Sequence, residues 1–263
     1  MNDEFADAQT LSLIVHHSSL NMPNVHPPHL YPAYKSTILR APTQPLVLVG
    51  EHLKDRSLPV FGESVIGKLD NDLTKNARVN GEPIGERIKV QGRVMDEYGR
   101  GLPNVLIEIW QANSAGRYIH KAEIHDAPLD PNFLGGGRLL TDSEGFYSFR
   151  TIKPGAYPWG NHYNAWRHNH IHFSVLGHQL EHRLVTQMYF PGDPLFDYDP
   201  IFQSTPAHAR ELLIAKFRMD WTEAEFALAY EFNIVLNGRK KTRLSDGKIA
   251  TNALTDHRAI FCL

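Results

Sequence analysis

The clearest pattern along the chain is a series of short runs in which apolar and polar residues alternate. Val, Ile, Phe, Tyr and Trp are enriched in these runs, and Gly, Pro and Asp separate them, which is typical of β-strands joined by turns. Six or more strands with little helix indicate an all-β protein, either a sandwich or a barrel. The predicted strands cover residues 86–95, 104–111, 146–152, 170–176, 184–190 and, as one long strand, 226–236.

Two stretches depart from the strand pattern. Ser204-Thr205-Pro206, followed by the apolar run ending at Ile214, predicts a short helix near residues 206–217. Residues 1–85 are rich in proline and lack helical periodicity, yet they contain apolar patches. We therefore expect an irregular N-terminal arm over 1–85 that packs on the core or on a partner. A core over 86–243 and a C-terminal extension over 244–263 complete the predicted organisation.

Composition narrows the class of protein. The chain has 263 residues, of which 42% are hydrophobic and 21% are charged, as in ordinary globular proteins. The net charge of -2 gives no reason to expect nucleic acid or an anionic membrane as a partner. No apolar run reaches the length of a transmembrane helix, and the acidic start does not resemble a signal peptide. Cys262 is the single cysteine, so a disulfide within the chain is excluded and a cytoplasmic location is expected.

The strongest chemical signal is His170-Ile171-His172 on a predicted strand. Side chains two residues apart on a strand point to the same face, so both imidazoles can reach one metal ion. The residues alone leave the alternative of two solvated imidazoles open.

The sequence pattern also leaves the identity of the metal open. Zinc would need a third His, Asp or Glu and a water beside the two histidines. Iron(II) would need one carboxylate, which Asp193, Asp197 or Asp199 could supply from nearby in sequence. Tyrosines are the other candidate donors, namely Tyr118 and Tyr157. A phenol titrates near pH 10, but a highly charged cation can hold it deprotonated, and the resulting hard oxygen anion suits iron(III). Base rates favour ordinary buried tyrosines.

At these residues the chain resembles the intradiol ring-cleaving dioxygenases, and within that family the protocatechuate 3,4-dioxygenase β chains. The resemblance covers roughly residues 30–243 and rests on many separate motifs in the same order. The matching segments are 34–42, 85–90, 109–113, 127–133, 141–145, 147–155, the histidine pair, 187–190 and the strand that ends at Leu236.

The resemblance implies a β-sandwich core and an iron(III) held by Tyr118, Tyr157, His170 and His172. Tyr157 and His172 correspond to the axial pair, and Tyr157, in a stretch rich in proline and glycine, is expected on a loop that can release it when substrate arrives. Other implied roles are assigned by position. Arg167 would stabilise charge on the ring, Gln187 would line the oxygen-reactive side, and the pocket walls would be Tyr34, Trp159 and Ile201.

The implied reaction is cleavage of protocatechuate by O2 between its two hydroxyl-bearing carbons, giving 3-carboxy-cis,cis-muconate in aromatic catabolism by the β-ketoadipate pathway. The implied partner is a homologous α chain in a hetero-oligomer. The sequence departs from the family pattern at His168-Asn169, at Gly160 and in the tail from Leu244, which leaves another substituted catechol such as 4-sulfocatechol open. Two further alternatives remain: another mononuclear metal enzyme that uses the histidine pair and an aspartate, and a non-catalytic transthyretin-like sandwich that only binds.

Overall fold

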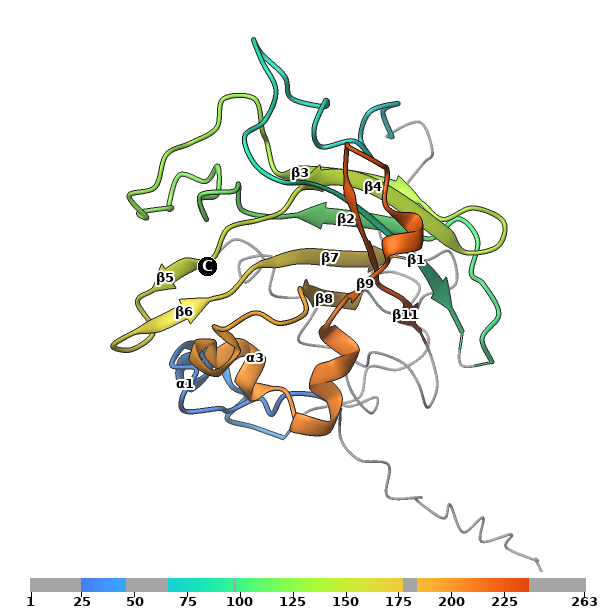
Figure 1. Cartoon of the computed structure of the whole chain (residues 1–263). Coiled ribbons are helices and arrows are strands. Elements are labelled where there is room, and N and C mark those ends of the chain that lie inside the picture. The colour runs from blue at the N-terminus through green and yellow to red at the C-terminus, as the bar shows by residue number, and fades with distance from the viewer. Residues whose placement is uncertain (1–24, 46–65, 97, 177–183, 237–263) are drawn as a thin grey trace, which may run out of the picture.

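The computed structural model describes residues 25–45, 66–96, 98–176 and 184–236. Two main sheets dominate this part of the chain, and short helices and loops gather at one end of them (Figure 1). The expectation of a β-sandwich core is confirmed. The predicted extension over 244–263 lies outside the described residues.

The first sheet is organised around β1 (Arg87–Met95). This strand pairs antiparallel with β4 (Phe146–Ile152) and parallel with both β10 (Leu228–Glu231) and β11 (Ile234–Val235), while β9 (Lys216–Phe217) pairs with β10. Burial alternates strictly along β1, as the sequence pattern predicts for a strand with one face in the core. The inward side chains include Ile88, Val90 and Val94.

The second sheet has the order β3-β2-β7-β8, all antiparallel. Its strands are β2 (Leu106–Trp110), β3 (Gly136–Leu140), β7 (His170–Leu176) and β8 (Leu184–Tyr189). Six of the seven residues of β7 are buried, on both faces of the sheet. Ile171, Phe173 and Val175 join the core between the two sheets. Because side chains alternate along a strand, His170 and His172 lie on the opposite face.

A two-stranded hairpin continues from the second sheet. It consists of β5 (Tyr157–Trp159) and β6 (Ala165–Arg167), and β6 leads almost directly into β7 (Figure 1). After β8 the chain forms the 3-10 turn η2 (Phe196–Tyr198), the helix α3 (Pro200–Ser204), the 3-10 turn η3 (Ala207–Leu213) and the 3-10 turn η4 (Met219–Trp221). The helix expected near 206–217 is therefore a 3-10 segment, and its last predicted residues are strand.

The long strand predicted over 226–236 is wrong, because it is broken between β10 and β11. Both halves pair with β1, but at the break the side-chain oxygen of Asn233 accepts a hydrogen bond from the Arg93 N–H at 2.8 Å. A side chain thus replaces one main-chain partner and interrupts the ladder.

Part of the predicted arm lies among the described residues and contacts the hairpin. The helix α1 (Ser36–Arg40) follows Tyr34, and the side chain of Asn161 binds the chain on both sides of that tyrosine. Asn161 accepts from the Lys35 N–H at 2.8 Å and donates to the Ala33 carbonyl at 2.6 Å. In the described ranges, no helix is long and apolar enough to cross a bilayer.

Candidate metal centre

The structure brings the four predicted donor side chains together. The Tyr118 hydroxyl lies 3.3 Å from Nε2 of His170 and 3.1 Å from Nε2 of His172. The Tyr157 ring packs edge-on against Tyr118 with 5.7 Å between ring centroids, and 5.9 Å from the ring of His170. Two imidazole nitrogens and two phenol oxygens from three separate segments therefore converge on one small volume.

Each histidine is held in a defined orientation. Nδ1 of His170 lies 2.5 Å from the His168 carbonyl oxygen, which makes Nδ1 the protonated nitrogen and leaves the Nε2 lone pair free. Trp110 stacks face to face on His172, at 4.7 Å and an interplanar angle of 5°. The pairing of Trp110 with His172 across β2 and β7 produces this contact. The described contacts thus orient both imidazoles before any ligand is bound.

Burial and charge keep both imidazoles neutral. Burial lowers the pKa of His170 well below its ordinary value, and the nearby positive charge of Arg167 lowers it further. The same two causes lower the pKa of His172 to about 3. Neutral imidazole is the form that binds metals, so the protein matrix already selects it at neutral pH.

The two tyrosines, unlike the histidines, must be charged to bind a metal strongly, because the phenolate is the donor form. Burial raises the pKa of Tyr118 well above its ordinary value, and the Tyr157 hydroxyl adds to the effect. Burial also raises the pKa of Tyr157, although the Arg167 charge partly counteracts it. The Tyr157 hydroxyl is buried and has no hydrogen-bond partner among the described residues. In this surrounding both phenols stay protonated unless a strongly charged cation takes the place of the proton.

Main-chain contacts fix the two tyrosine segments against each other. The Asn113 carbonyl accepts from Gly116 and Gly155, which precede Tyr118 and Tyr157. A Cβ on Gly155 would lie 2.3 Å from the Ser114 carbonyl oxygen, and one on Gly116, where φ is +80°, would lie 2.3 Å from the Ala156 oxygen. The expectation that Tyr157 sits on a loose loop is wrong, because it begins β5 and pairs with Arg167. Displacement of Tyr157 would therefore require its side chain to rotate.

The predicted catalytic pair is also in contact. Arg167 is fully buried, and one of its terminal nitrogens donates to the side-chain oxygen of Gln187. The same oxygen accepts from the Tyr189 hydroxyl at 2.6 Å. On the other side of the guanidinium, Nε donates to the Asp199 carboxylate at 2.9 Å. A buried cation is thus held close enough to influence the pKa of all four candidate donors.

Two of the three predicted wall residues contact each other. Tyr34 packs edge-on against Trp159 with 5.3 Å between centroids, and the Arg40 guanidinium lies 4.7 Å above the Tyr34 ring. Ile201 lies apart from this pair in sequence, half-buried on α3.

Known proteins are similar to this chain in both sequence and fold. Residues 57–238 match a family described as dioxygenase, and residues 23–52 match the N-terminal segment of the protocatechuate 3,4-dioxygenase β subunit. The protocatechuate 3,4-dioxygenase β chain of Burkholderia cepacia is 62% identical over 217 residues, which cover 82% of this chain and 92% of that one. The chain belongs to the intradiol ring-cleaving dioxygenases.

Other members of the family are more distant. Catechol 1,2-dioxygenase of Candida albicans is 35% identical over 46% of this chain and 42% of its own length. The crystal structure of 3-chlorocatechol 1,2-dioxygenase from Rhodococcus opacus 1CP superposes with a TM-score of 0.51 at 22% identity, over 74% of this chain and 72% of that one. This likeness concerns the fold only.

The three aspartates considered as metal ligands in the dioxygenase have other partners among the described residues. In the part of the chain that the structure describes, no three His, Cys, Asp or Glu side chains are grouped as a metal site would require. Asp193 binds the N–H groups of Asn169 and Leu195, Asp197 contacts Gln203, and Asp199 pairs with Arg167. The alternative of two histidines and an aspartate therefore lacks its third ligand among these residues.

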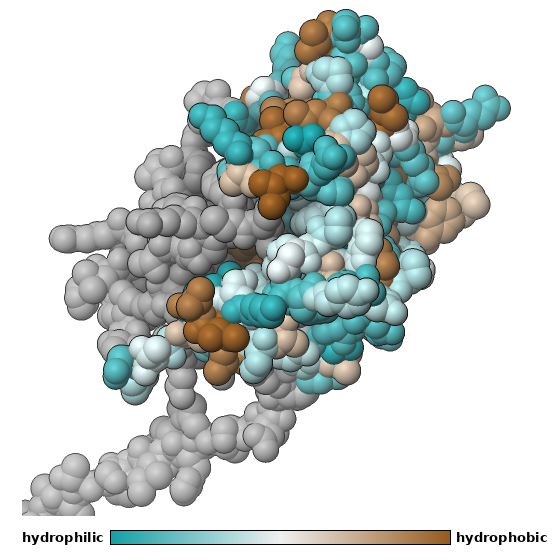
Figure 2. All heavy atoms as spheres, turned by 90° about the vertical axis from the view of Figure 1, so that its left-hand side faces the viewer, coloured by the Kyte–Doolittle hydropathy of each residue, from teal (hydrophilic) through white to brown (hydrophobic). Residues whose placement is uncertain are grey.

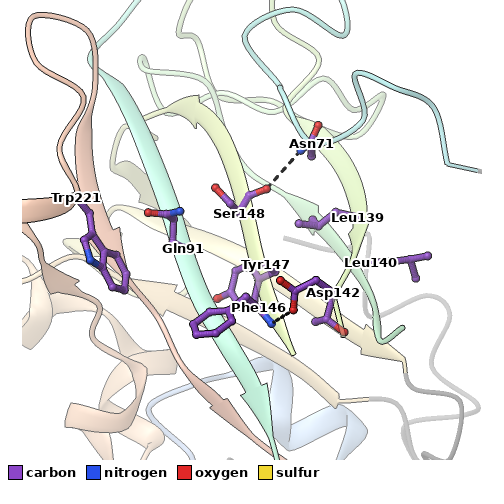
Figure 3. A pocket seen from close by; sticks show the side chains of 10 residues that line it. Asn71, Gln91, Leu139, Leu140, Asp142, Phe146, Tyr147, Ser148 and Trp221 are labelled. Carbon is purple, nitrogen blue, oxygen red and sulfur yellow. Dashed lines mark hydrogen bonds between the residues drawn. The ribbon is translucent and has the colours of Figure 1, made fainter. Parts of the chain in front are cut away.

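One described hollow of the dioxygenase lies away from the four donors. It has a volume of about 580 Å³ and opens on the first sheet, between Gln91, Ser148, Phe146 and Trp221 (Figure 3). None of the predicted site residues lines it, and we assign it no role in ring cleavage.

Sequence reasoning missed four residues of the centre in this dioxygenase. Trp110 could have been found from strand pairing, because it faces His172 once β2 and β7 are placed side by side. Tyr189 could have been found by alternation, because it lies two residues after Gln187 on β8. His168 and Asn113 carry no such signal, since their contacts depend on how loops fold over the sheet.

Proposed function

We propose that the protein is the catalytic β chain of a protocatechuate 3,4-dioxygenase, which cleaves protocatechuate with O2 to 3-carboxy-cis,cis-muconate. The observation that carries the proposal is the 62% identity to a protein of that name over 92% of its length. The convergence of Tyr118, Tyr157, His170 and His172 supports it from the side of chemistry.

We further propose that these four side chains hold iron(III). The donor set fits the ion, because two phenolates and two neutral imidazoles offer hard, anionic and rigid ligation. The buried, unpartnered Tyr157 hydroxyl supports the assignment, since such groups are costly unless something binds them. When bound, the iron would supply a Lewis-acidic centre that orients the two catechol oxygens.

The protein's own residues would handle protons and charge. Tyr157, held as a phenolate by the metal, would take up a proton from a substrate hydroxyl, because its hydroxyl is buried and has no hydrogen-bond partner among the described residues. Arg167 and Gln187 would present donors to negative charge that develops on the ring. Tyr34, Trp159 and Ile201 would form walls of the substrate pocket.

A homologous α chain is the proposed partner, in a hetero-oligomer. The face of the molecule that carries the hairpin and α1 shows brown apolar patches among hydrophilic surface (Figure 2). Leu39 of α1 and Ile124 of the segment after Tyr118 are 93% and 94% exposed. Exposed apolar patches commonly mark interaction sites, so a partner would bind over this face, with an N-terminal arm over 1–85 contributing to the contact. The single cysteine agrees with a cytoplasmic location.

The proposal is tested with the chain co-expressed with its α chain. O2 uptake and product identity are followed on protocatechuate, catechol and 4-sulfocatechol, and metal is measured on the same sample. We expect about one iron per chain, a red-brown phenolate-to-iron band and preference for protocatechuate. Preference for 4-sulfocatechol would change the substrate only, whereas an iron-loaded protein inactive on all three would contradict the proposed function.

A further inference from the structure

Arg167 and two neighbouring side chains form a buried polar group that the four candidate donors do not explain. Arg167, His168 and Asp199 all have 0% of their side-chain surface exposed. Charged side chains are rarely this buried unless they are paired and have a task. Asp199 comes from the turn before α3, whereas the other two come from the end of β6 and the residue after it.

Asp199 uses both carboxylate oxygens. Oδ1 accepts from the N–H groups of Ile201 and Phe202 at 2.8 and 3.2 Å, so it caps α3. Oδ2 accepts from Nε of Arg167 at 2.9 Å and lies 2.8 Å from Nδ1 of His168, off the direction of a linear hydrogen bond. The carboxylate is therefore fixed by a helix on one side and fixes the arginine on the other.

His168 closes the other side of this carboxylate. Its ring stacks on Tyr189 at 4.3 Å, and the rings of Phe196 and Phe202 meet it edge-on at 4.6 and 5.2 Å. Burial alone would raise the pKa of Asp199, but the Arg167 charge and the contact with His168 lower it far below its usual range. Asp199 is thus a carboxylate shielded from water, and its charge lies directly against Arg167 and His168.

These contacts hold the Arg167 guanidinium in a single orientation. Nε is committed to Asp199 and Nη2 to Gln187. Nη1 is buried and has no acceptor among the described residues. The guanidinium is planar, so fixing two of its nitrogens also fixes the direction of the third.

We propose that Asp199, supported by His168, is a positioning residue for ring cleavage: the pair holds Arg167 so that Nη1 remains available to the substrate. This inference rests on the proposed function, because it assigns Arg167 a task in that reaction. It adds residues that act through Arg167 and do not touch the substrate themselves.

The main test is a double-mutant cycle in the complete complex with the α chain. Asp199→Asn keeps the size of the side chain but removes its charge, and we expect kcat on protocatechuate to fall about tenfold or more, with a smaller change in KM. In the Arg167→Lys background, the same substitution should lower kcat by less than about twofold. The phenolate-to-iron band and the iron content should stay within the range of the unmutated complex, because no donor is changed.

Asp197→Asn is the matched control. Asp197 is exposed, lies two residues earlier in the same turn and contacts Gln203 instead of Arg167. It should leave kcat unchanged. A second readout does not depend on activity: in the metal-free complex, the losses of melting temperature from Asp199→Asn and Arg167→Lys should be less than additive, since they break the same contact.

Asp199→Asn could prevent folding, so His168→Phe provides an independent variant. It preserves the ring packing and removes the nitrogen that contacts Asp199. We expect kcat to fall about threefold or more, and this loss should disappear in the Arg167→Lys background. Unchanged kcat in His168→Phe, or full and additive losses in the Arg167→Lys background, would overturn the proposal. Failure of the proposed function would look different, because the unmutated complex itself would then be inactive on protocatechuate.

Discussion

Tyr118 and Tyr157 carry the same phenol group but lie in different surroundings. The Tyr118 hydroxyl is within 3.3 Å of both imidazoles, whereas the Tyr157 hydroxyl has no hydrogen-bond partner among the described residues. The Arg167 charge lowers the pKa of both phenols, but the Tyr157 hydroxyl raises the pKa of Tyr118. The two tyrosines should therefore have different roles.

Exchange of each tyrosine for phenylalanine should separate these roles. Tyr157→Phe should retain part of the iron and lose roughly 100-fold or more in turnover, the scale of a lost proton acceptor. Tyr118→Phe should lose iron more readily and lack the phenolate band that otherwise persists when substrate binds anaerobically. Iron content and visible spectra with and without substrate measure both effects. Normal turnover of Tyr157→Phe would contradict the displacement of Tyr157.

At the scale of single residues, four donors were predicted from the sequence, but strand geometry justified only two of them. The histidine pair followed from strand alternation, because His170 and His172 share a face. Tyr118 and Tyr157 lie 39 positions apart in sequence, and no periodicity connects them, so only the family resemblance pointed to them. Asp199 was considered as a metal ligand, but a carboxylate's neighbour cannot be read from sequence distance, and its partner is Arg167.

The turns and strands that carry the tyrosines form one rigid unit. Asn113 makes six hydrogen bonds: its two oxygens accept from four N–H groups, and its two nitrogens donate to the carbonyls of Arg117 and Pro128. The glycines at 116 and 155 allow the two main chains to approach closely. The spacing of the two phenols is thus set by main-chain contacts.

A methyl group between these main chains should disrupt the unit. Gly155→Ala would place its Cβ 2.3 Å from the Ser114 carbonyl oxygen, and we expect a loss of roughly 1–3 kcal/mol in unfolding free energy together with weaker iron retention. Gly160→Ala is the control, because nothing lies within 4 Å of the added carbon on the same hairpin. Thermal unfolding and metal analysis of both variants give the comparison. Equal stability of the two would show that the close approach is not a constraint.

The contact between the hairpin and α1 should affect substrate binding more than chemistry. Asn161→Ala removes the hydrogen bonds to Ala33 and Lys35 that hold Tyr34 against Trp159. We expect KM to rise several-fold while kcat changes little, because no donor side chain is touched. Asn161→Asp keeps the acceptor for Lys35, so its KM should lie between those of the unmutated protein and Asn161→Ala. A fall in kcat with unchanged KM would place Tyr34 in the chemical step instead of the pocket wall.

Elements were predictable where alternation was strong and not where side chains replace main-chain pairing. The strands around Val90, Phe149 and Phe173 were found because their inward residues repeat every second position. The hairpin β5–β6 was missed, since its three-residue strands contain Pro158 and are followed by Gly160. The strand β3 was missed altogether, because two of its five residues, Gly136 and Gly137, carry no side-chain signal.

At the scale of the whole molecule, apolar side chains are exposed on the face that carries the hairpin and α1. If this face binds the α chain, Leu39→Asp combined with Ile124→Asp should reduce complex formation at least tenfold, because burying two charges without partners is costly. Met219→Asp is the control, since Met219 is 70% exposed on η4. Light scattering after co-expression measures the assembly. A stable monomer of the unmutated chain, fully active on protocatechuate, would refute the need for a partner.

The double burial of β7 has a consequence for how this enzyme can change. One side of the strand fills the interior of the sandwich and the other side carries the proposed ligands, so every position from 170 to 175 is buried against one of these two surroundings. Laboratory evolution toward new catechols should therefore leave β7 almost untouched. Beneficial substitutions should accumulate in the segment around Tyr34 and in the hairpin around Gly160, where an added side-chain carbon would have no neighbour within 4 Å.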